Sequence, residues 1–252
     1  MEPQLSIPEQ MYDLDQWKLQ LPIKTEKSIL EIKKDLSNYQ SKYFSLTKDK
    51  ALAFYVESDG DTTPNSKNPR TELREMTGKS NEDGPSSFSN LPLRGQGDWP
   101  LTGSHTLTVE CAIMKLPPTE KGIIIGQIHG NNNDLNPQLC KLYFDTKNKL
   151  TARIKNDLDP SSKKDVNIPL GNYDLGQKFT YTISMVDHII TITVTSKINK
   201  VKLTVTRSYT FKNKYWDGQK YYFKVGNYYQ INHKTPRTSS LVHCYLIKTD
   251  HQ

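Results

Sequence analysis

Apolar and polar residues alternate with a period of two along most of this chain. Segment 105–114 (HTLTVECAIM) gathers its apolar residues on one side, since successive side chains of an extended chain point to opposite faces. Segments 179–186 (FTYTISMV) and 189–196 (IITITVTS) flank the dipeptide Asp187-His188, and 200–211 keeps the same period. This spacing predicts a tight hairpin within a run of consecutive antiparallel strands.

Helical patterns are scarce. Segment 28–39 (SILEIKKDLSNY) has a candidate N-cap at Ser28 and apolar residues Ile29, Ile32 and Leu36 at helical spacing, so we expect a short helix there. Many short strands with few helices predict an all-β fold: a β-sandwich of the jelly-roll type with one or two short helices.

The length of 252 residues suits one large all-β domain or two small ones. No segment has the composition of a linker, and no internal repeat is visible. We therefore predict a single domain over residues 1–252, with its core roughly at 13–250. Long polar loops are predicted at 57–68, 78–97 and 130–137.

The chain is moderately basic. It has 34 Lys and Arg against 27 Asp and Glu, a formal net charge of +7. This favours an anionic partner: nucleic acid, an anionic membrane or an acidic polysaccharide. No apolar run is long enough to span a membrane, and no signal peptide is visible at the first residues.

The three cysteines, Cys111, Cys140 and Cys244, are too few and too scattered for a disulfide scaffold or a zinc site. We expect Cys111 and Cys244 to be buried free thiols, because each lies in an alternating strand. No group of His, Asp and Glu has metal-ligand spacing, so neither a metal nor another cofactor is predicted.

One strand carries an unusual polar face. In YFKVGNYYQ (222–230), Tyr222, Lys224, Gly226, Tyr228 and Gln230 share one side, and the other side is mostly apolar. The polar side is cationic, phenolic and amide-bearing, with a glycine at its centre that allows close approach to the backbone. It is suited to holding a polar ligand.

Two further strands show the same division. In RTELRE (70–75), Arg70, Glu72 and Arg74 point one way, and in IIIGQIHG (123–130), Gln127 and His129 share a face. Each pattern alone is common on solvated strands. Together they predict one functional sheet face lined by all three strands.

Four motifs in order give the chain a family resemblance: DLDQWKLQLPI (13–23), TTPNSKNPRTELREM (62–76), QIH (127–129) and YFKVGNYYQ (222–230). The chain resembles the polysaccharide lyase family 7 alginate lyases from near residue 13 to near its end. The resemblance implies a lectin-like jelly roll of two curved antiparallel sheets, forming a catalytic lyase domain with substrate in the groove of the concave sheet.

The same resemblance implies roles for the catalytic residues. Arg70 and Gln127 would bind and neutralise the substrate carboxylate, and His129 and Tyr228 would transfer protons. The implied reaction is β-elimination in alginate, in which the C5 proton is removed and O4 leaves. Donors on the carboxylate absorb the charge that develops, as an oxyanion hole does.

Five further positions are expected to bind substrate and orient neighbours: Glu72, Arg74, Lys224, Tyr222 and Gln230. Glu72 is expected to pair with the arginines rather than to act as an acid.

The resemblance also implies an extracellular enzyme, because alginate is extracellular. We expect a monomer that cleaves internally. Ile128, at the middle of the Q-[IV]-H motif, favours guluronate-containing blocks. The expected partner is alginate, and neither nucleic acid nor a membrane is expected.

Three alternatives remain at this point. A lyase of another polyuronate, such as glucuronan, faces the same elimination problem. A non-catalytic sandwich that binds acidic polysaccharide needs neither His129 nor Tyr228. A glycoside hydrolase needs two suitably spaced carboxylates, and these strand faces carry only Glu72.

Overall fold

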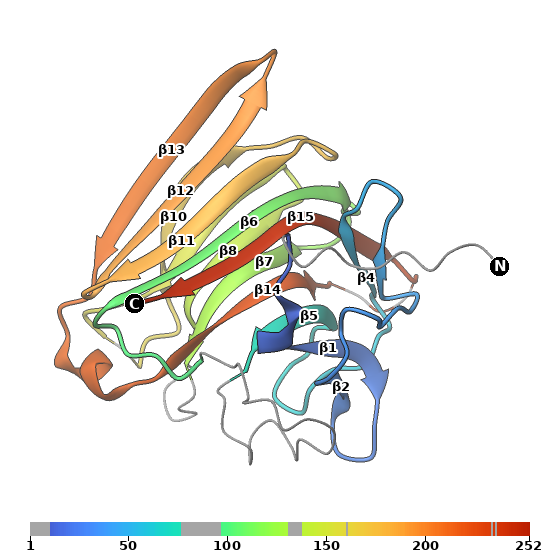
Figure 1. The fold of residues 1–252 in the computed structure, drawn as a ribbon, viewed down its shortest axis with the longest axis horizontal. Coiled ribbons are helices and arrows are strands. Elements are labelled where there is room, and N and C mark those ends of the chain that lie inside the picture. The colour runs from blue at the N-terminus through green and yellow to red at the C-terminus, as the bar shows by residue number, and fades with distance from the viewer. Residues whose placement is uncertain (1–10, 77–96, 131–137, 160, 233, 235) are drawn as a thin grey trace.

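The computed structural model describes residues 11–76, 97–130, 138–159, 161–232, 234 and 236–252. Two antiparallel sheets pack face to face as a sandwich, which confirms the predicted all-β fold (Figure 1). The predicted loops at 78–97 and 130–137 lie almost wholly outside these residues. No helix in the described part of the chain is long and apolar enough to cross a membrane.

The first sheet has eight strands in the order β10-β9-β8-β7-β14-β5-β1-β2. Their bounds are β1 Trp17–Lys24, β2 Ile29–Ile32, β5 Arg70–Glu75, β7 Gly122–Gly130, β8 Gln138–Asp145, β9 Lys149–Lys155, β10 Asp165–Asn172 and β14 Tyr221–Gln230.

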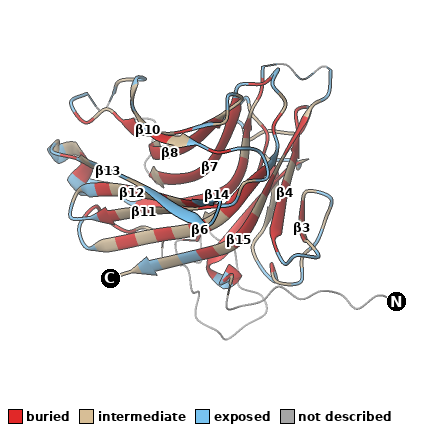
Figure 2. Cartoon of the chain, turned by 90° about the horizontal axis from the view of Figure 1, so that it is seen from above, coloured by how far each residue is buried: buried red, intermediate tan, exposed pale blue. Residues whose placement is uncertain are grey.

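The second sheet has seven strands in the order β13-β12-β11-β6-β15-β4-β3. Their bounds are β3 Phe44–Leu46, β4 Leu52–Glu57, β6 Ser104–Lys115, β11 Phe179–Val186, β12 Ile189–Ile198, β13 Val201–Thr210 and β15 Ser239–His251. The edge strand β13 is mostly exposed, as Figure 2 shows.

The predicted hairpin is confirmed. Strands β11 and β12 pair from Val186–Ile189 outward without a register shift. Asp187 and His188 both have positive φ, 45° and 70°, which is the conformation that a two-residue hairpin turn requires.

The predicted helix at 28–39 is wrong. Ile29–Ile32 form β2, which pairs with β1 at the sheet edge, and Glu31 lies opposite Gln20. Two β-branched isoleucines three residues apart suit a strand as well as a helix, and Asp35 has a φ of 55°, which no right-handed helix accommodates. The two helices present among the described residues are short 3₁₀ turns, η1 Leu14–Gln16 and η2 Lys214–Gly218.

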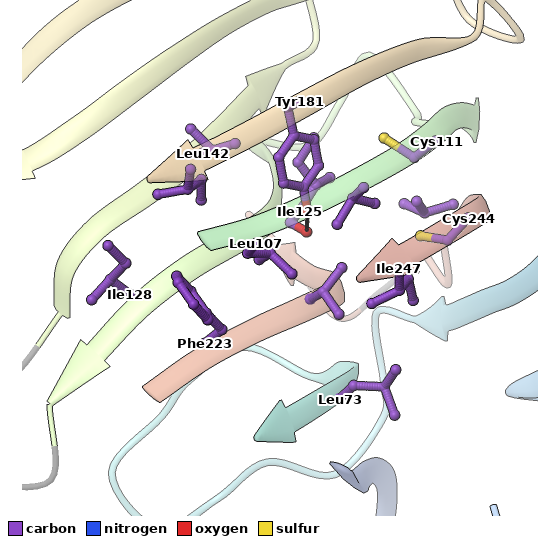
Figure 3. Packing of buried hydrophobic residues seen from close by; sticks show 14 of the residues in the cluster. Leu73, Leu107, Cys111, Ile125, Ile128, Leu142, Tyr181, Phe223, Cys244 and Ile247 are labelled. Carbon is purple, nitrogen blue, oxygen red and sulfur yellow. Dashed lines mark hydrogen bonds between the residues drawn. The ribbon is translucent and has the colours of Figure 1, made fainter. Parts of the chain in front are cut away.

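The hydrophobic core fills the space between the sheets. Leu73, Ile128 and Phe223 enter it from the eight-stranded sheet, while Leu107 and Tyr181 enter from the seven-stranded sheet (Figure 3). All three cysteines are buried and free, as expected for Cys111 and Cys244. The apolar side chains of the eight-stranded sheet point into the core. The polar side chains of β5, β7 and β14 therefore lie on the outer face of that sheet.

A β-bulge in β7 interrupts its alternation. The register to β8 shifts between Ile124 and Gly126, and Ile123, Ile125 and Ile128 all belong to the core. The unpaired residue is Ile125. A Cβ on the next residue, Gly126, would lie 2.7 Å from the Tyr181 hydroxyl, so only glycine fits there. The bulge turns Gln127 to the outer face; strict alternation from Ile125 would have pointed it into the core.

Candidate active site

The register of three strands brings the predicted site residues together. On β14, Lys224 lies opposite Arg74, and Tyr228 lies opposite Arg70 of β5. On its other side, β14 pairs with β7. There Lys224 lies opposite Gln127, and Tyr222 lies opposite His129. Cross-strand partners on one face are close enough to touch, so a single patch forms.

Glu72 stands at the centre of this patch. Its carboxylate is 1% exposed and forms ion pairs with Lys224 and, at 3.4 Å, with Arg70. The Gln127 amide donates to its other oxygen at 2.5 Å. Glu72 was expected to pair with the arginines; it pairs with Arg70 and with Lys224, and it fixes three side chains in relation to one another.

His129 is oriented by its own strand end and by Tyr222. Its Nδ1 lies 2.9 Å from the Gly130 carbonyl oxygen, which can only accept, so Nδ1 carries the proton. The Tyr222 hydroxyl lies 2.8 Å from the same nitrogen, and the two rings stack with centroids 5.2 Å apart. In the neutral imidazole, Nε2 then holds the free lone pair.

The surroundings keep His129 neutral. Burial lowers its pKa well below the ordinary value, and the positive charges of Lys224, Arg74 and Arg70 lower it further. Burial likewise lowers the pKa of Lys224 to about 8, with Arg70 and Arg74 acting in the same direction and Glu72 opposing them. The site thus combines a neutral base with a concentration of positive charge.

Tyr228 lies at the other end of the patch, half-buried. The Arg70 guanidinium lies over its ring, with Cζ 3.9 Å from the centroid. Its hydroxyl is 2.9 Å from Ser66 Oγ. The Arg70 Nε is buried and has no hydrogen-bond partner among the described residues.

Three of the predicted positions differ in detail from the expectation. Tyr222 is only 5% exposed and lies between His129 and Arg74, whose Cζ is 4.2 Å from its ring centroid. Gln230 accepts from Asn68 Nδ2 at 3.2 Å and donates to the Tyr228 carbonyl oxygen at 3.3 Å. At Gly226 the close approach comes from β5, because an added Cβ would lie 2.6 Å from the Thr71 carbonyl oxygen.

Polar residues that the sequence patterns above did not single out lie on both sides of the patch. On β1, Lys18 lies opposite Arg74 and Gln20 opposite Glu72, and both contact Glu31 of β2, at 3.3 and 2.8 Å. The alternation in WKLQL, with Lys18 and Gln20 between apolar residues, was the available signal.

On the opposite side, β8 to β10 continue the polar face. Lys141, opposite Gln127, forms an ion pair with Asp165 at 2.7 Å. Arg153 lies over the Tyr143 ring, 3.4 Å from its centroid. Within the described ranges, no group of three or more His, Cys, Asp or Glu side chains is arranged to hold a metal ion.

Known proteins are similar to this chain in fold and in sequence. The alginate lyase family model matches residues 12–251. The solved structure of alginate lyase A1-II′, a member of polysaccharide lyase family 7, has a TM-score of 0.76 and 32% identity, covering 96% of each chain. No protein in the curated set of sequences matches this chain.

Two other solved alginate lyases are also similar over nearly their whole length. AlgAT5 of polysaccharide lyase family 7 has a TM-score of 0.66 and 27% identity, covering 98% of this chain and 99% of its own. PA1167 from Pseudomonas aeruginosa has a TM-score of 0.73 and 26% identity, covering 96% and 100%. The family match over almost the entire sequence shows that this chain belongs to the polysaccharide lyase family 7 alginate lyases.

Proposed function

We propose that this alginate lyase removes the C5 proton of one uronate with His129 and protonates the departing O4 with Tyr228. Arg70 and Gln127 bind and neutralise the carboxylate of the same sugar. The observation that carries this proposal is the Glu72 cluster, which holds Arg70 and Gln127 beside the neutral His129 and the Arg70-stacked Tyr228.

The chemical difficulty lies in the carboxylate. An ionised carboxylate stabilises a neighbouring carbanion poorly, so the C5 proton is hard to remove. The Arg70 guanidinium can bind both carboxylate oxygens, and the Gln127 amide supplies a further donor. Removing one such donor in other enzymes costs about 2.7–4 kcal/mol of barrier, which sets the scale expected for Gln127→Ala.

The proton transfers balance in one elimination. Nε2 of His129 takes the C5 proton, the C5–H electron pair becomes the C4–C5 double bond, and the C4–O4 bond breaks. O4 receives the Tyr228 proton, which leaves a phenolate and an imidazolium that exchange protons with water. In guluronate the C5 proton and O4 lie on opposite faces, which suits two separate groups. In mannuronate they lie on the same side, and Tyr228 serves both roles.

We further propose internal cleavage of guluronate-containing blocks. Charged and polar side chains extend from Lys18 and Glu31 on one side of the patch to Lys141 and Arg153 on the other, which supports binding of uronates on both sides of the cleaved bond. A His→Asn, Tyr→Phe variant of A1-II′ was solved with the substrate GGMG, and a Tyr→Phe variant of A1-II′ with the product GGG. Ile128 in the QIH motif adds support.

We propose that the enzyme acts outside the cell as a monomer. The support is chemical: alginate is a large extracellular polyanion, and the residues of the patch all come from one chain.

One assay tests these proposals. The protein is mixed with polyguluronate, polymannuronate, mixed-block alginate and glucuronan, and the absorbance of the new C4–C5 double bond is followed. We expect the highest rate on guluronate-containing blocks, with early products of many lengths. Early release of only the smallest products would contradict internal cleavage, and a faster rate on polymannuronate would contradict the guluronate preference.

A further inference from the structure

The hydroxyl of Tyr228 has a hydrogen-bond partner outside the four proposed catalytic residues. Ser66 lies in the loop between β4 and β5, half-buried, and its Oγ is 2.9 Å from the Tyr228 oxygen. Four residues later the same loop enters β5 at Arg70. The loop therefore supplies both the cation that lies over the Tyr228 ring and the group that contacts its reacting atom.

The hydrogen bonds of Ser66 determine which way the Tyr228 proton points. Ser66 Oγ donates its single proton to the Asn68 carbonyl oxygen at 3.0 Å and accepts from the Asn68 backbone N–H at 3.1 Å. A hydroxyl has one donor and two acceptor positions. With its proton already used, Ser66 can only accept from Tyr228, so Tyr228 donates in the resting enzyme.

When Tyr228 loses its proton, its oxygen needs a hydrogen-bond donor in place of an acceptor. A phenolate is only an acceptor and is stabilised by donors. On its other sides Tyr228 has the Arg70 guanidinium from β5 and is paired in register with the apolar Ile124 of β7. Ser66 can supply a donor by rotation of its hydroxyl from the Asn68 carbonyl to the phenolate oxygen, a movement of one proton that leaves the heavy atoms in place.

The loop is fixed to the strand that carries Tyr228. Asn68 Nδ2 donates to Gln230 Oε1 at 3.2 Å, and Asn68 Oδ1 accepts from the Ile231 backbone N–H at 3.1 Å. Ser66 and Tyr228 thus belong to one hydrogen-bonded unit. Gln230 thus helps to anchor the loop that carries Ser66, through its bond to Asn68.

We propose that Ser66 is a positioning residue for Tyr228, which accepts the phenolic proton at rest and donates its own to the phenolate formed when O4 is protonated. This inference rests on the proposed role of Tyr228 as the acid. It gives Ser66 a function in the turnover step and not in holding the polysaccharide.

The test compares Ser66→Ala with Ser66→Thr, which keeps the hydroxyl, on alginate. We expect Ser66→Ala to lower kcat about 10- to 100-fold, the scale of one hydrogen bond to a charged group, with KM within about twofold. Ser66→Thr should restore kcat.

Two further variants make the outcome decisive. Ser161→Ala removes a turn serine hydroxyl bonded to Asp159 far from the patch in sequence, and should match the wild type. Tyr228→Phe is measured in parallel: if it retains turnover, the proposed function fails, whereas an inactive Tyr228→Phe beside an unaffected Ser66→Ala overturns only the role of Ser66. A lower kcat in Ser66→Ala that Ser66→Thr does not restore also overturns it, since that indicates a general loosening of the loop.

Discussion

The Tyr181 hydroxyl on β11 donates a hydrogen bond of 2.8 Å to the Ile125 carbonyl oxygen on β7, across the core between the two sheets (Figure 3). Both groups are fully buried, and burial raises the pKa of the Tyr181 phenol well above its ordinary value. The bond lies at the β7 bulge, one residue before Gly126. It therefore holds the backbone that turns Gln127 and His129 toward the outer face.

Replacing Tyr181 by Phe tests whether this bond positions the site. The change leaves a buried carbonyl without its donor, which costs about 1–3 kcal/mol. We expect a lower midpoint of urea unfolding together with a lower kcat, because Gln127 and His129 follow the bulge.

Tyr173→Phe is the matched control. The Tyr173 hydroxyl is also buried and donates to a backbone carbonyl, that of Leu170, at 3.0 Å, but it lies outside the patch. It should lose similar stability and keep its kcat. An equal loss of kcat in the two variants would show that the Tyr181 bond serves stability alone.

Replacing Glu72 by Gln removes the charge that balances Lys224 and Arg70 and keeps an amide oxygen for Gln127. The cations then repel one another and shift. We expect kcat/KM on alginate to fall about 100-fold, the scale of a misplaced catalytic group. Glu110→Gln, on the outer face of the other sheet opposite Thr180, should have the wild-type rate. A wild-type rate in Glu72→Gln would contradict a central role for Glu72.

The lowered pKa of His129 gives two linked expectations for acidic pH. The base is active when neutral, so the acidic limb of kcat/KM should lie below pH ~6.5, the ordinary histidine value. Below that pH the unfolded chain binds a proton that the folded chain excludes. The free energy of unfolding therefore falls as the pH falls, by at most about 1.4 kcal/mol per pH unit for this group.

Subtracting the unfolding free energy of His129→Gln from that of the wild type at each pH isolates this contribution. The difference should decrease steadily below pH ~6.5. An acidic limb above that value, or a difference that does not change with pH, would contradict the assignment of a neutral buried base.

Gly226 has a φ of 142°, and an added Cβ would meet the Thr71 carbonyl oxygen at 2.6 Å and Phe54 Cδ1 at 2.9 Å. We expect Gly226→Ala to cost about 1–3 kcal/mol or more, measured by urea unfolding. Gly218→Ala, where nothing lies within 4 Å, should change stability by less than about 0.5 kcal/mol. Equal stabilities would show that β5 and β14 can separate without cost.

Alternation predicted the strands at 70–75, 105–114, 179–186 and 189–196, and the residues that share a face on them. Alternation alone placed Arg70, Glu72 and Arg74 together, because β5 is regular and its apolar Leu73 must face the core. The pattern failed for β2. The spacing of Ile29 and Ile32 is compatible with a helix and with a strand, and only the pairing with β1 decides for the strand.

Other features depend on contacts between distant segments. At the β7 bulge, Tyr181 from the opposite sheet bonds to the Ile125 carbonyl oxygen and leaves no room for a side chain on Gly126. Glu75, at the end of RTELRE, turns inward to accept from the Phe223 backbone N–H at 2.9 Å and from His251 Nε2 at 2.7 Å. Ser66 approaches Tyr228 from a loop 162 residues away in sequence. No local pattern encodes such pairs.

The central claim is that Arg70, Gln127, His129 and Tyr228 act on one uronate, with carboxylate binding separate from proton transfer. The most direct measurement takes Tyr228→Phe, follows double-bond absorbance on alginate, and determines the affinity for an alginate oligosaccharide by calorimetry. We predict an affinity within about threefold of wild type and turnover reduced by at least about 10²–10⁴-fold, the usual contribution of a general acid. Turnover close to that of the wild type would contradict the account.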